Sequence, residues 1–274
     1  DVFEPGSTVK PFTVAVALES GNYTPQSTID TTPGFIRVDN FTVRDPLNRG
    51  ELTLGEIIMH SSQVGISKLA LELNEYEVWG MFEKLGFGRD VCAGFPGESA
   101  GYLPNHRRWK DIERATFAYG YGLTVTPLQL AASYLTIASG GIKRDVSLIE
   151  GMERNDERIY SRKVANELKL MLAAVVTEGT ATKAAIEGYT VAGKTGTVRK
   201  IGDSGYEDTR HLAFFAGLAP VDNPRLVGLV LINEPKSVKS GGGAIAAPVF
   251  SRVMQNALRI LNVPPGARVE GGAA

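Results

Sequence analysis

The sequence predicts an α+β domain in which an antiparallel sheet is flanked by helices and accompanied by a mostly helical subdomain. Apolar residues at helical spacing dominate the middle of the chain, and this spacing changes in the C-terminal third. There, residues 189–197, 211–219 and 226–232 are predicted strands, and residues 220–224 form a proline-bounded turn between the last two. Because consecutive strands joined by a short turn pair antiparallel, we expect a sheet backed by the terminal helices.

The first predicted helix follows Pro5-Gly6 and ends at Ser20-Gly21, with an apolar run over residues 12–18. Pro11 falls in its first turn, where a missing N–H costs little. A surface segment rich in Thr, Pro and Asn then continues to about residue 50. Short strands are predicted within it at residues 35–38 and 41–43.

Capping signals mark the next helices. Thr53 and Glu56 form a capping box, and Thr126 followed by Pro127 and Gln129 marks another helix start. Further helices are predicted at residues 64–73, 78–85, 163–177 and 248–261, whereas residues 92–111 are predicted to be loop. The helix at 163–177 is expected to direct five side chains into the core: Val164, Leu168, Leu170, Met171 and Val175.

Composition limits the function. The 274 residues are 43% hydrophobic and 22% charged, which is ordinary for a globular protein. A net charge of -1 implies no surface for a polyanion, so nucleic acid is not an expected partner. The single cysteine, Cys92, excludes an internal disulfide and is interpreted as a small core residue. The three histidines (His60, His106 and His211) have no metal-ligand spacing with it, so we predict neither a metal nor a cofactor.

No stretch of the sequence approaches the roughly 20 apolar residues that span a bilayer. The chain opens at Asp1, shortly before its candidate nucleophile, without an initiator methionine or a signal peptide. We therefore interpret residues 1–274 as a fragment, with any anchor or export signal outside it.

The segment from Glu4 to Phe12 places a hydroxyl and an amine three residues apart at the start of the first helix. Residues three apart share a helix face, so the Lys10 amine can reach the Ser7 hydroxyl. An amine near apolar surface loses proton affinity and can act as a base, and a helix N-terminus offers amides for an oxyanion. Since Ser-x-x-Lys also occurs by chance and a serine after Pro-Gly is often only an N-cap, this segment alone is weak evidence.

Two further motifs follow in order: Ser61-Ser62-Gln63 and Lys194-Thr195-Gly196. This order of motifs is typical of serine acyl-transfer enzymes that act on β-lactams and related peptides. In it, Ser7 attacks a carbonyl as Lys10 removes its proton, Ser61 relays a proton between Lys10, Lys194 and the leaving amine, and Gln63 holds the substrate amide.

The strand motif supplies the rest of the predicted site. Lys194 keeps it electropositive for a terminal carboxylate, to which the hydroxyls of Thr195 and Thr197 hydrogen-bond. Gly196 lets the strand edge approach the substrate, and the backbone amides of Ser7 and Thr197 form the oxyanion hole.

The chain resembles the transpeptidase domain of class B penicillin-binding proteins, closest to the septal cell-division transpeptidases of Gram-negative bacteria. The resemblance extends over nearly the whole chain. It rests on five segments: residues 4–10 (EPGSTVK), 61–70 (SSQVGISKLA), 108–116 (RWKDIERAT), 119–130 (YGYGLTVTPLQL) and 194–197 (KTGT).

The resemblance implies the fold shared by penicillin-binding proteins and serine β-lactamases. It implies a D,D-transpeptidase that cross-links peptidoglycan stem peptides ending in D-Ala-D-Ala, is acylated by β-lactams, and faces the periplasm from the inner membrane with division proteins as partners. D,D-carboxypeptidase activity is expected as a side reaction. It also implies that Tyr121 and Arg199 contact substrate.

Two departures from the family pattern matter. The family has Asn where this chain has Gln63, whose amide lies one methylene farther out. A displacement near 1 Å can cost on the order of 100-fold in rate, so altered turnover or β-lactam affinity is expected. Family members also carry a membrane helix, a pedestal and the first sheet strands before the nucleophile. We therefore expect an incomplete sheet edge in this chain.

Two other readings remain open from the sequence. A serine β-lactamase shares the three motifs, although Glu98 precedes a Ser-Ala-Gly loop and makes no convincing hydrolytic base. A β-lactam-sensing receptor domain would use acylation as a signal. Among other side chains, His60 is interpreted as a helix-end polar residue. Phe214 and Phe215 must face opposite sides of a strand, one in the core and one lining a groove.

Overall fold

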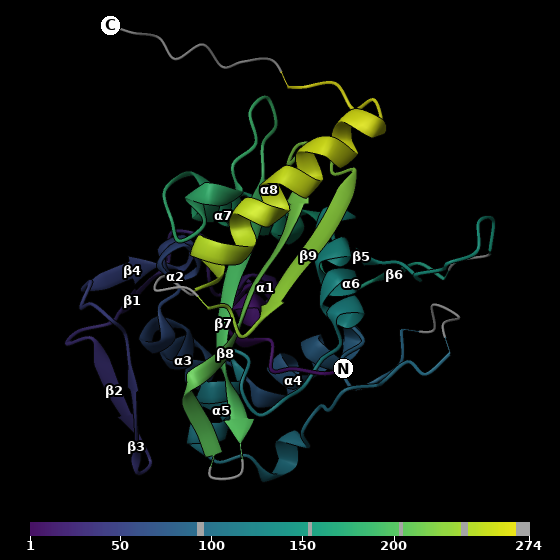
Figure 1. Cartoon of the computed structure of the whole chain (residues 1–274). Coiled ribbons are helices and arrows are strands. Elements are labelled where there is room, and N and C mark those ends of the chain that lie inside the picture. The colour runs from purple at the N-terminus through teal and green to yellow at the C-terminus, as the bar shows by residue number, and fades with distance from the viewer. Residues whose placement is uncertain (92–95, 153–154, 203–204, 237–240, 267–274) are drawn as a thin grey trace, which may run out of the picture.

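The computed structural model describes residues 1–91, 96–152, 155–202, 205–236 and 241–266 (Figure 1). Within them a three-stranded antiparallel sheet has the order β7-β8-β9. Its strands are β7 (Ala192–Gly202), β8 (Gly205–Ala219) and β9 (Leu226–Asn233). The predicted antiparallel pairing is confirmed, with Lys194 opposite Ala216 and Ala219 opposite Leu226.

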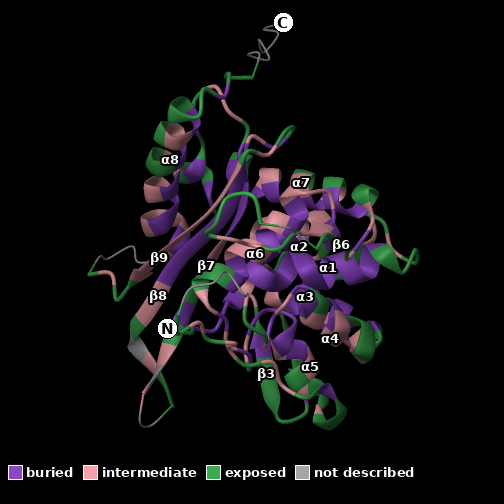
Figure 2. Ribbon diagram, turned by 90° about the vertical axis from the view of Figure 1, so that its right-hand side faces the viewer, coloured by how far each residue is buried: buried purple, intermediate pink, exposed green. Residues whose placement is uncertain are grey.

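Helices cover both faces of this sheet (Figure 2). Helix α8 (Gly242–Ile260) contacts β8 and β9, and its Phe250 ring lies 4.7 Å from that of Phe215. On the other face Phe214 meets Phe3 at 5.2 Å, and α6 (Pro127–Ala138) and α7 (Arg162–Thr177) contact the strands. Phe214 and Phe215 do face opposite sides, but both are fully buried, so the expectation that one lines a groove is wrong.

Helix α1 (Lys10–Glu19) is the centre of the helical part. Its residues from Lys10 to Leu18 are all buried, and its main contacts are with α2, α3, α4 and α7. Only α8 of the two terminal helices therefore backs the sheet directly. The other helices of this part are α2 (Leu54–His60), α3 (Gln63–Glu72), α4 (Glu75–Lys84) and α5 (Asp111–Phe117).

Short elements complete the described chain. Three 3-10 turns lie at Gly6–Val9, His106–Arg108 and Thr182–Ala184. Two-stranded pairings join β1 (Thr28–Asp30) to β4 (Glu51–Thr53), β2 (Phe35–Val38) to β3 (Phe41–Arg44), and β5 (Ile142–Lys143) to β6 (Glu157–Arg158). The predicted capping boxes at Thr53 and Thr126 are both present.

Several predicted boundaries are wrong. Helix α5 was missed: its first residue, Asp111, is the last residue of the predicted loop. It begins where the Lys110 N–H donates to Glu113 Oε2 at 2.7 Å. Helix α8 begins at Gly242 and contains Pro248, whose missing N–H leaves one carbonyl of the helix without its partner. Strand β7 begins at Ala192 rather than residue 189 and continues to Gly202. Leu170 is 67% exposed, because on a helix it lies about 200° from Leu168.

Some predictions fall on residues without a description. Cys92 and most of the tail predicted to be loose after Pro264 lie outside the described residues. Within the described residues, no helix is both long and apolar enough to cross a membrane. In the sheet described here β9 pairs with β8 alone, so its outer edge has no strand beside it.

Candidate active site

The nucleophile candidate Ser7 lies in the 3-10 turn Gly6–Val9 that leads into α1. Gly6 has φ +50° and donates its N–H to the Gly120 carbonyl at 3.1 Å; a Cβ at Gly6 would lie 2.6 Å from Val198 Cγ1. Next to Ser7, the Thr8 carbonyl accepts the hydroxyl of the buried Tyr134 at 2.9 Å. The turn is thus fixed on both sides of Ser7, which is itself only half-buried.

Lys10 opens α1 and is fully buried. Its Nζ donates to the Ser61 carbonyl at 2.5 Å and to Ser61 Oγ at 3.2 Å. Ser61 presents both oxygens because it caps α2 in the left-handed conformation, with φ 60°. Among the described residues Ser7 Oγ has no hydrogen bond, and Lys10, which was expected to come within reach of Ser7, bonds to Ser61. A neutral amine that donates two N–H groups to Ser61 keeps its lone pair for the Ser7 proton.

A second fully buried amine belongs to Lys194 on β7. Its Nζ has no hydrogen-bond partner among the described residues. Burial lowers the pKa of Lys194 to about 7. Burial, together with the charge of Lys194, lowers the pKa of Lys10 well below its usual value, and Asp45 opposes this shift. Both causes favour the neutral form of Lys10, which is the form that a proton acceptor requires.

Asp45 organises the second motif and was not predicted from the sequence. Its carboxylate accepts the Ser62 hydroxyl at 2.5 Å, the Gln63 N–H at 2.6 Å and the Val64 N–H at 3.2 Å. A carboxylate at these amides stabilises the start of α3. Asp45 lies in an irregular surface segment, where no periodicity or motif indicates its partners.

Gln63 is the first residue of α3. Its side-chain amide makes no hydrogen bond among the described residues and is partly exposed. Its donor and acceptor are therefore accessible to a ligand. Its position depends on Asp45, which holds its backbone N–H, and on Ser62, which caps the helix by accepting the Gly65 N–H at 2.8 Å.

The strand motif has partners within the fold. Thr195 Oγ1 lies 3.0 Å from Thr180 Oγ1, and Thr197 Oγ1 accepts the Gly242 N–H at 3.0 Å. The Thr197 hydroxyl thus keeps its proton for a ligand. Gly196 has a packing reason that the sequence did not reveal, since a Cβ there would lie 2.0 Å from Phe214 Cε2.

Tyr121 and Arg199 lie on facing segments. The pKa of Tyr121 is raised by burial and by Glu4, while the charge of Arg199 opposes the shift. The Tyr121 ring lies 5.5 Å from that of Tyr119, whose own centroid is 5.9 Å from Lys10 Nζ. These tyrosines extend from the buried amine toward the β7–β8 hairpin.

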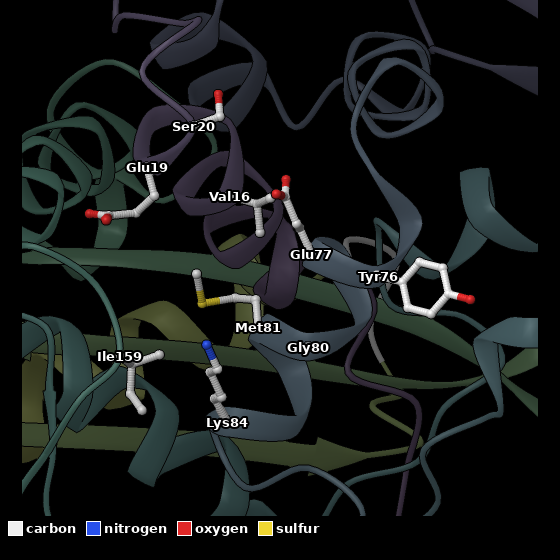
Figure 3. A pocket seen from close by; sticks show the side chains of 9 residues that line it. All are labelled: Val16, Glu19, Ser20, Tyr76, Glu77, Gly80, Met81, Lys84 and Ile159. Atoms are coloured by element: carbon white, nitrogen blue, oxygen red, sulfur yellow. The ribbon is translucent and has the colours of Figure 1, made fainter.

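Other candidate sites have fewer groups that could take part in a reaction. His60 ends α2, and burial together with Arg49 lowers its pKa. No cluster of three or more metal-ligating side chains occurs in the described part of the chain. A cavity of about 460 Å³ lies between the C-terminal end of α1, α4 and Ile159 (Figure 3). Its walls carry Glu19, Glu77 and Lys84 around an apolar floor, and none of the predicted site residues lines it.

The three motifs therefore meet where the turn before α1, the end of α2 and β7 converge. Residues 1–255 match the family described as the penicillin binding protein transpeptidase domain, and the chain belongs to this family.

Two named relatives show which enzymes this chain is similar to. The chain is 41% identical over 273 residues to the peptidoglycan D,D-transpeptidase FtsI of Escherichia coli K12, covering 99% of this chain and 46% of the relative. It is 38% identical over 267 residues to the probable peptidoglycan D,D-transpeptidase PenA of Neisseria meningitidis, covering 97% of this chain and 46% of the relative. It thus spans less than half the length of these relatives.

A solved structure agrees with the fold. The apo transpeptidase domain of penicillin-binding protein 3 from Burkholderia pseudomallei superposes with a TM-score of 0.92 at 40% identity. The match covers 97% of this chain and 82% of that one. The predicted fold class is confirmed.

Proposed function

We propose that this chain is the catalytic domain of a peptidoglycan D,D-transpeptidase that cross-links stem peptides at the division septum. The observation that carries the proposal is a pair of fully buried amines, one of which is held by both oxygens of Ser61. Buried amines with lowered pKa values are costly to a fold and are typical of sites that move protons.

Acylation proceeds from the neutral Lys10. Its lone pair takes the Ser7 hydroxyl proton as Ser7 Oγ attacks the carbonyl carbon of the penultimate D-Ala in a D-Ala-D-Ala donor. The backbone amides of Ser7 and Thr197 stabilise the oxyanion. The C–N bond then breaks, the terminal D-Ala leaves after its nitrogen receives a proton through Ser61, and an ester remains on Ser7.

The second half-reaction resolves this ester. An acceptor amine attacks the ester carbonyl, its proton passes to the amine network, and the bond to Ser7 Oγ breaks with return of a proton to that oxygen. Gln63, Thr195, Thr197, Tyr121 and Arg199 bind the donor and Lys194 supports its carboxylate. A β-lactam follows the first half-reaction alone, because its opened ring keeps the leaving nitrogen attached.

We infer that the full protein works at the periplasmic face of the inner membrane with division proteins as partners. The FtsI relatives are named peptidoglycan D,D-transpeptidases, which supports an enzyme that acts on peptidoglycan. The unpaired edge of β9 supports a further strand from chain beyond residues 1–274. Slower hydrogen exchange of the β9 amides in a longer chain than in this one would support that strand, and equal exchange would contradict it.

The test of the function is incubation with a β-lactam, followed by intact mass and peptide mapping, on this chain and on Ser7→Ala. We expect a stable adduct on Ser7 that is absent from the variant. Rapid loss of the drug without an adduct would instead indicate a β-lactamase. An intact drug without an adduct would contradict acyl transfer by this chain.

A further inference from the structure

Glu4 joins three separate segments beside the site. It lies three residues before Ser7 and is only 9% exposed. Its Oε1 accepts the Gly122 N–H at 3.0 Å and the Tyr206 hydroxyl at 3.1 Å, and its Oε2 lies 3.0 Å from the same hydroxyl. One carboxylate thus connects the nucleophile turn, the Gly120–Gly122 turn and the β7–β8 hairpin.

The Tyr206 ring strengthens this connection. It packs edge-on against Tyr121, with ring centroids 5.8 Å apart at 74°, and Tyr121 in turn packs against Tyr119 at 5.5 Å. Three tyrosine rings therefore form a continuous row from the Lys10 amine to the hairpin. Tyr206 pairs with Ile201 beyond the register shift between Arg199 and Ile201, so its contacts fix the outer half of the hairpin.

The outer half of the hairpin has other side-chain contacts that do not reach the nucleophile. Lys200 Nζ and Arg210 Nη2 bond Glu234 Oε1 at 2.6 and 3.0 Å, and Glu234 directly follows β9. These ion pairs hold the hairpin to its own sheet. A two-stranded ribbon has little stability of its own, so a contact with the helical part decides how the hairpin is held against it.

The buried Glu4 carboxylate depends on the hydrogen bond from Tyr206. Burial raises the pKa of the Glu4 carboxyl, while the bonds from Gly122 and Tyr206 favour its ionised form. A buried carboxylate is stable only when donors satisfy it, and charge-assisted hydrogen bonds are stronger than neutral ones. Loss of the Tyr206 hydroxyl would leave Gly122 as the one donor to Glu4 among the described residues.

We propose that Glu4 and Tyr206 form a latch that holds the β7–β8 hairpin against the nucleophile turn and thereby sets the rate of acyl transfer more than the affinity for the acyl donor. The proposal rests on the proposed acylation of Ser7. The Glu4 side of the latch carries Ser7 and the hairpin side carries Thr197, so the latch fixes the separation of the two amides proposed for the oxyanion hole. Both latch residues act as positioning residues, because neither touches the reacting atoms.

The first experiment measures β-lactam acylation of Ser7 by stopped flow, separating the acylation rate constant from the dissociation constant of the preceding complex. Tyr206→Phe keeps the ring and removes the hydroxyl. We expect the rate constant to fall about tenfold while the dissociation constant changes less than about twofold, since misplacement affects the transition state most. An unchanged rate constant, or a change in the dissociation constant alone, would overturn the proposal.

A double-mutant cycle makes the coupling specific. Glu4→Ala should slow acylation as Tyr206→Phe does, and the double variant should be no slower than the slower single variant. Glu4→Gln should restore most of the rate, because its amide oxygen still accepts the Tyr206 hydroxyl. Tyr76→Phe is the matched control: Tyr76 is 57% exposed against 50% for Tyr206, and its hydroxyl makes no hydrogen bond within the described residues. Rate losses that multiply in the double variant would exclude a latch.

Hydrogen exchange tests the latch without relying on catalysis. The β8 amides from Tyr206 to Leu212 should exchange faster in Tyr206→Phe than in the parent, whereas amides of α1 should not change. If no variant and no parent forms an adduct while this difference persists, the proposed function fails and the latch as a structural contact stands. If the adduct forms normally and exchange is unchanged, the latch fails and the function stands.

Discussion

The groups proposed to react and the groups proposed to bind the substrate lie in contrasting surroundings. Lys10 and Lys194 are fully buried, and the oxygens that hold Lys10 come from a helix end. On the facing edge of β7, by contrast, Thr197 and Arg199 are exposed, and the hairpin that continues from them is fixed by a half-exposed tyrosine. Burial is what lowers the pKa of an amine, whereas binding a peptide requires an accessible edge. The fold meets both requirements on one strand, because Lys194 is buried while Thr197 and Arg199 are exposed.

The largest effect should follow from removing the base on the buried side. Lys10→Met keeps the length and apolar stem of the side chain but removes the proton acceptor. We expect β-lactam acylation of Ser7 to slow by about 10³-fold, within the range for loss of general base catalysis. Stopped-flow acylation of the variant and the parent measures this. A loss of less than about tenfold would show that another group takes the Ser7 proton.

Lys194→Met tests how much the buried Lys194 amine lowers the free energy of unfolding. The Lys194 pKa is lowered from its usual value of 10.5 to about 7, so the unfolded chain binds more protons than the folded one between these values. Parent stability should therefore rise with pH from about 7 to about 10.5 and lack this gain below 7. We expect the variant to be more stable by about 2–4 kcal/mol at pH 7, because an apolar side chain replaces an unpaired buried amine.

Urea denaturation of both proteins at pH 6.5, 8 and 9.5 measures this difference, which should shrink as the pH rises. The same variant should raise the pKa of Lys10, since the charge of Lys194 is one of the causes that lower it. The acid limb of the acylation profile should then move to higher pH. A stability difference that is independent of pH would contradict the account of Lys194.

The contacts of the buried groups were harder to predict than the helices and the motifs themselves. The apolar periodicity and capping signals of α2, α3, α6 and α7 are local, so the sequence located these helices well. The three motifs likewise singled out Ser7, Lys10, Ser61 and Lys194 as candidates, and the structure places Lys10 in contact with Ser61. The Ser61 hydroxyl was expected to exchange protons with Lys10, but the Ser61 carbonyl was missed as a second partner of Lys10, because its position depends on the left-handed conformation of Ser61. Asp45 was missed because its partners lie far along the chain, and Gly196 was assigned to substrate approach when its packing against Phe214 depends on strand register.

Asp45→Asn tests the support beneath the second motif. The substitution keeps the size of the side chain but weakens its bonds to Ser62 and to the first amides of α3. We expect a loss of about 1–2 kcal/mol in the free energy of unfolding, as for an N-terminal charge that also caps a helix. Because Asp45 raises the pKa of Lys10, its removal should move the acid limb of acylation to lower pH. A shift to higher pH would show that Asp45 acts on Lys10 in another way.

The smallest expected effect concerns Ser61, where two variants separate the strain of the left-handed backbone from the role of the hydroxyl in proton transfer. Its φ of 60° disfavours any residue but glycine, so Ser61→Gly should be more stable than Ser61→Ala by about 1 kcal/mol. Both variants lose Oγ and keep the carbonyl that accepts Lys10 Nζ, so both should slow acylation to a similar extent. Urea denaturation and stopped-flow acylation of the pair give the two readouts independently. If glycine restored the rate as well as the stability, the Ser61 hydroxyl would have no part in proton transfer, and the left-handed backbone that presents its carbonyl would account for the whole role of this residue.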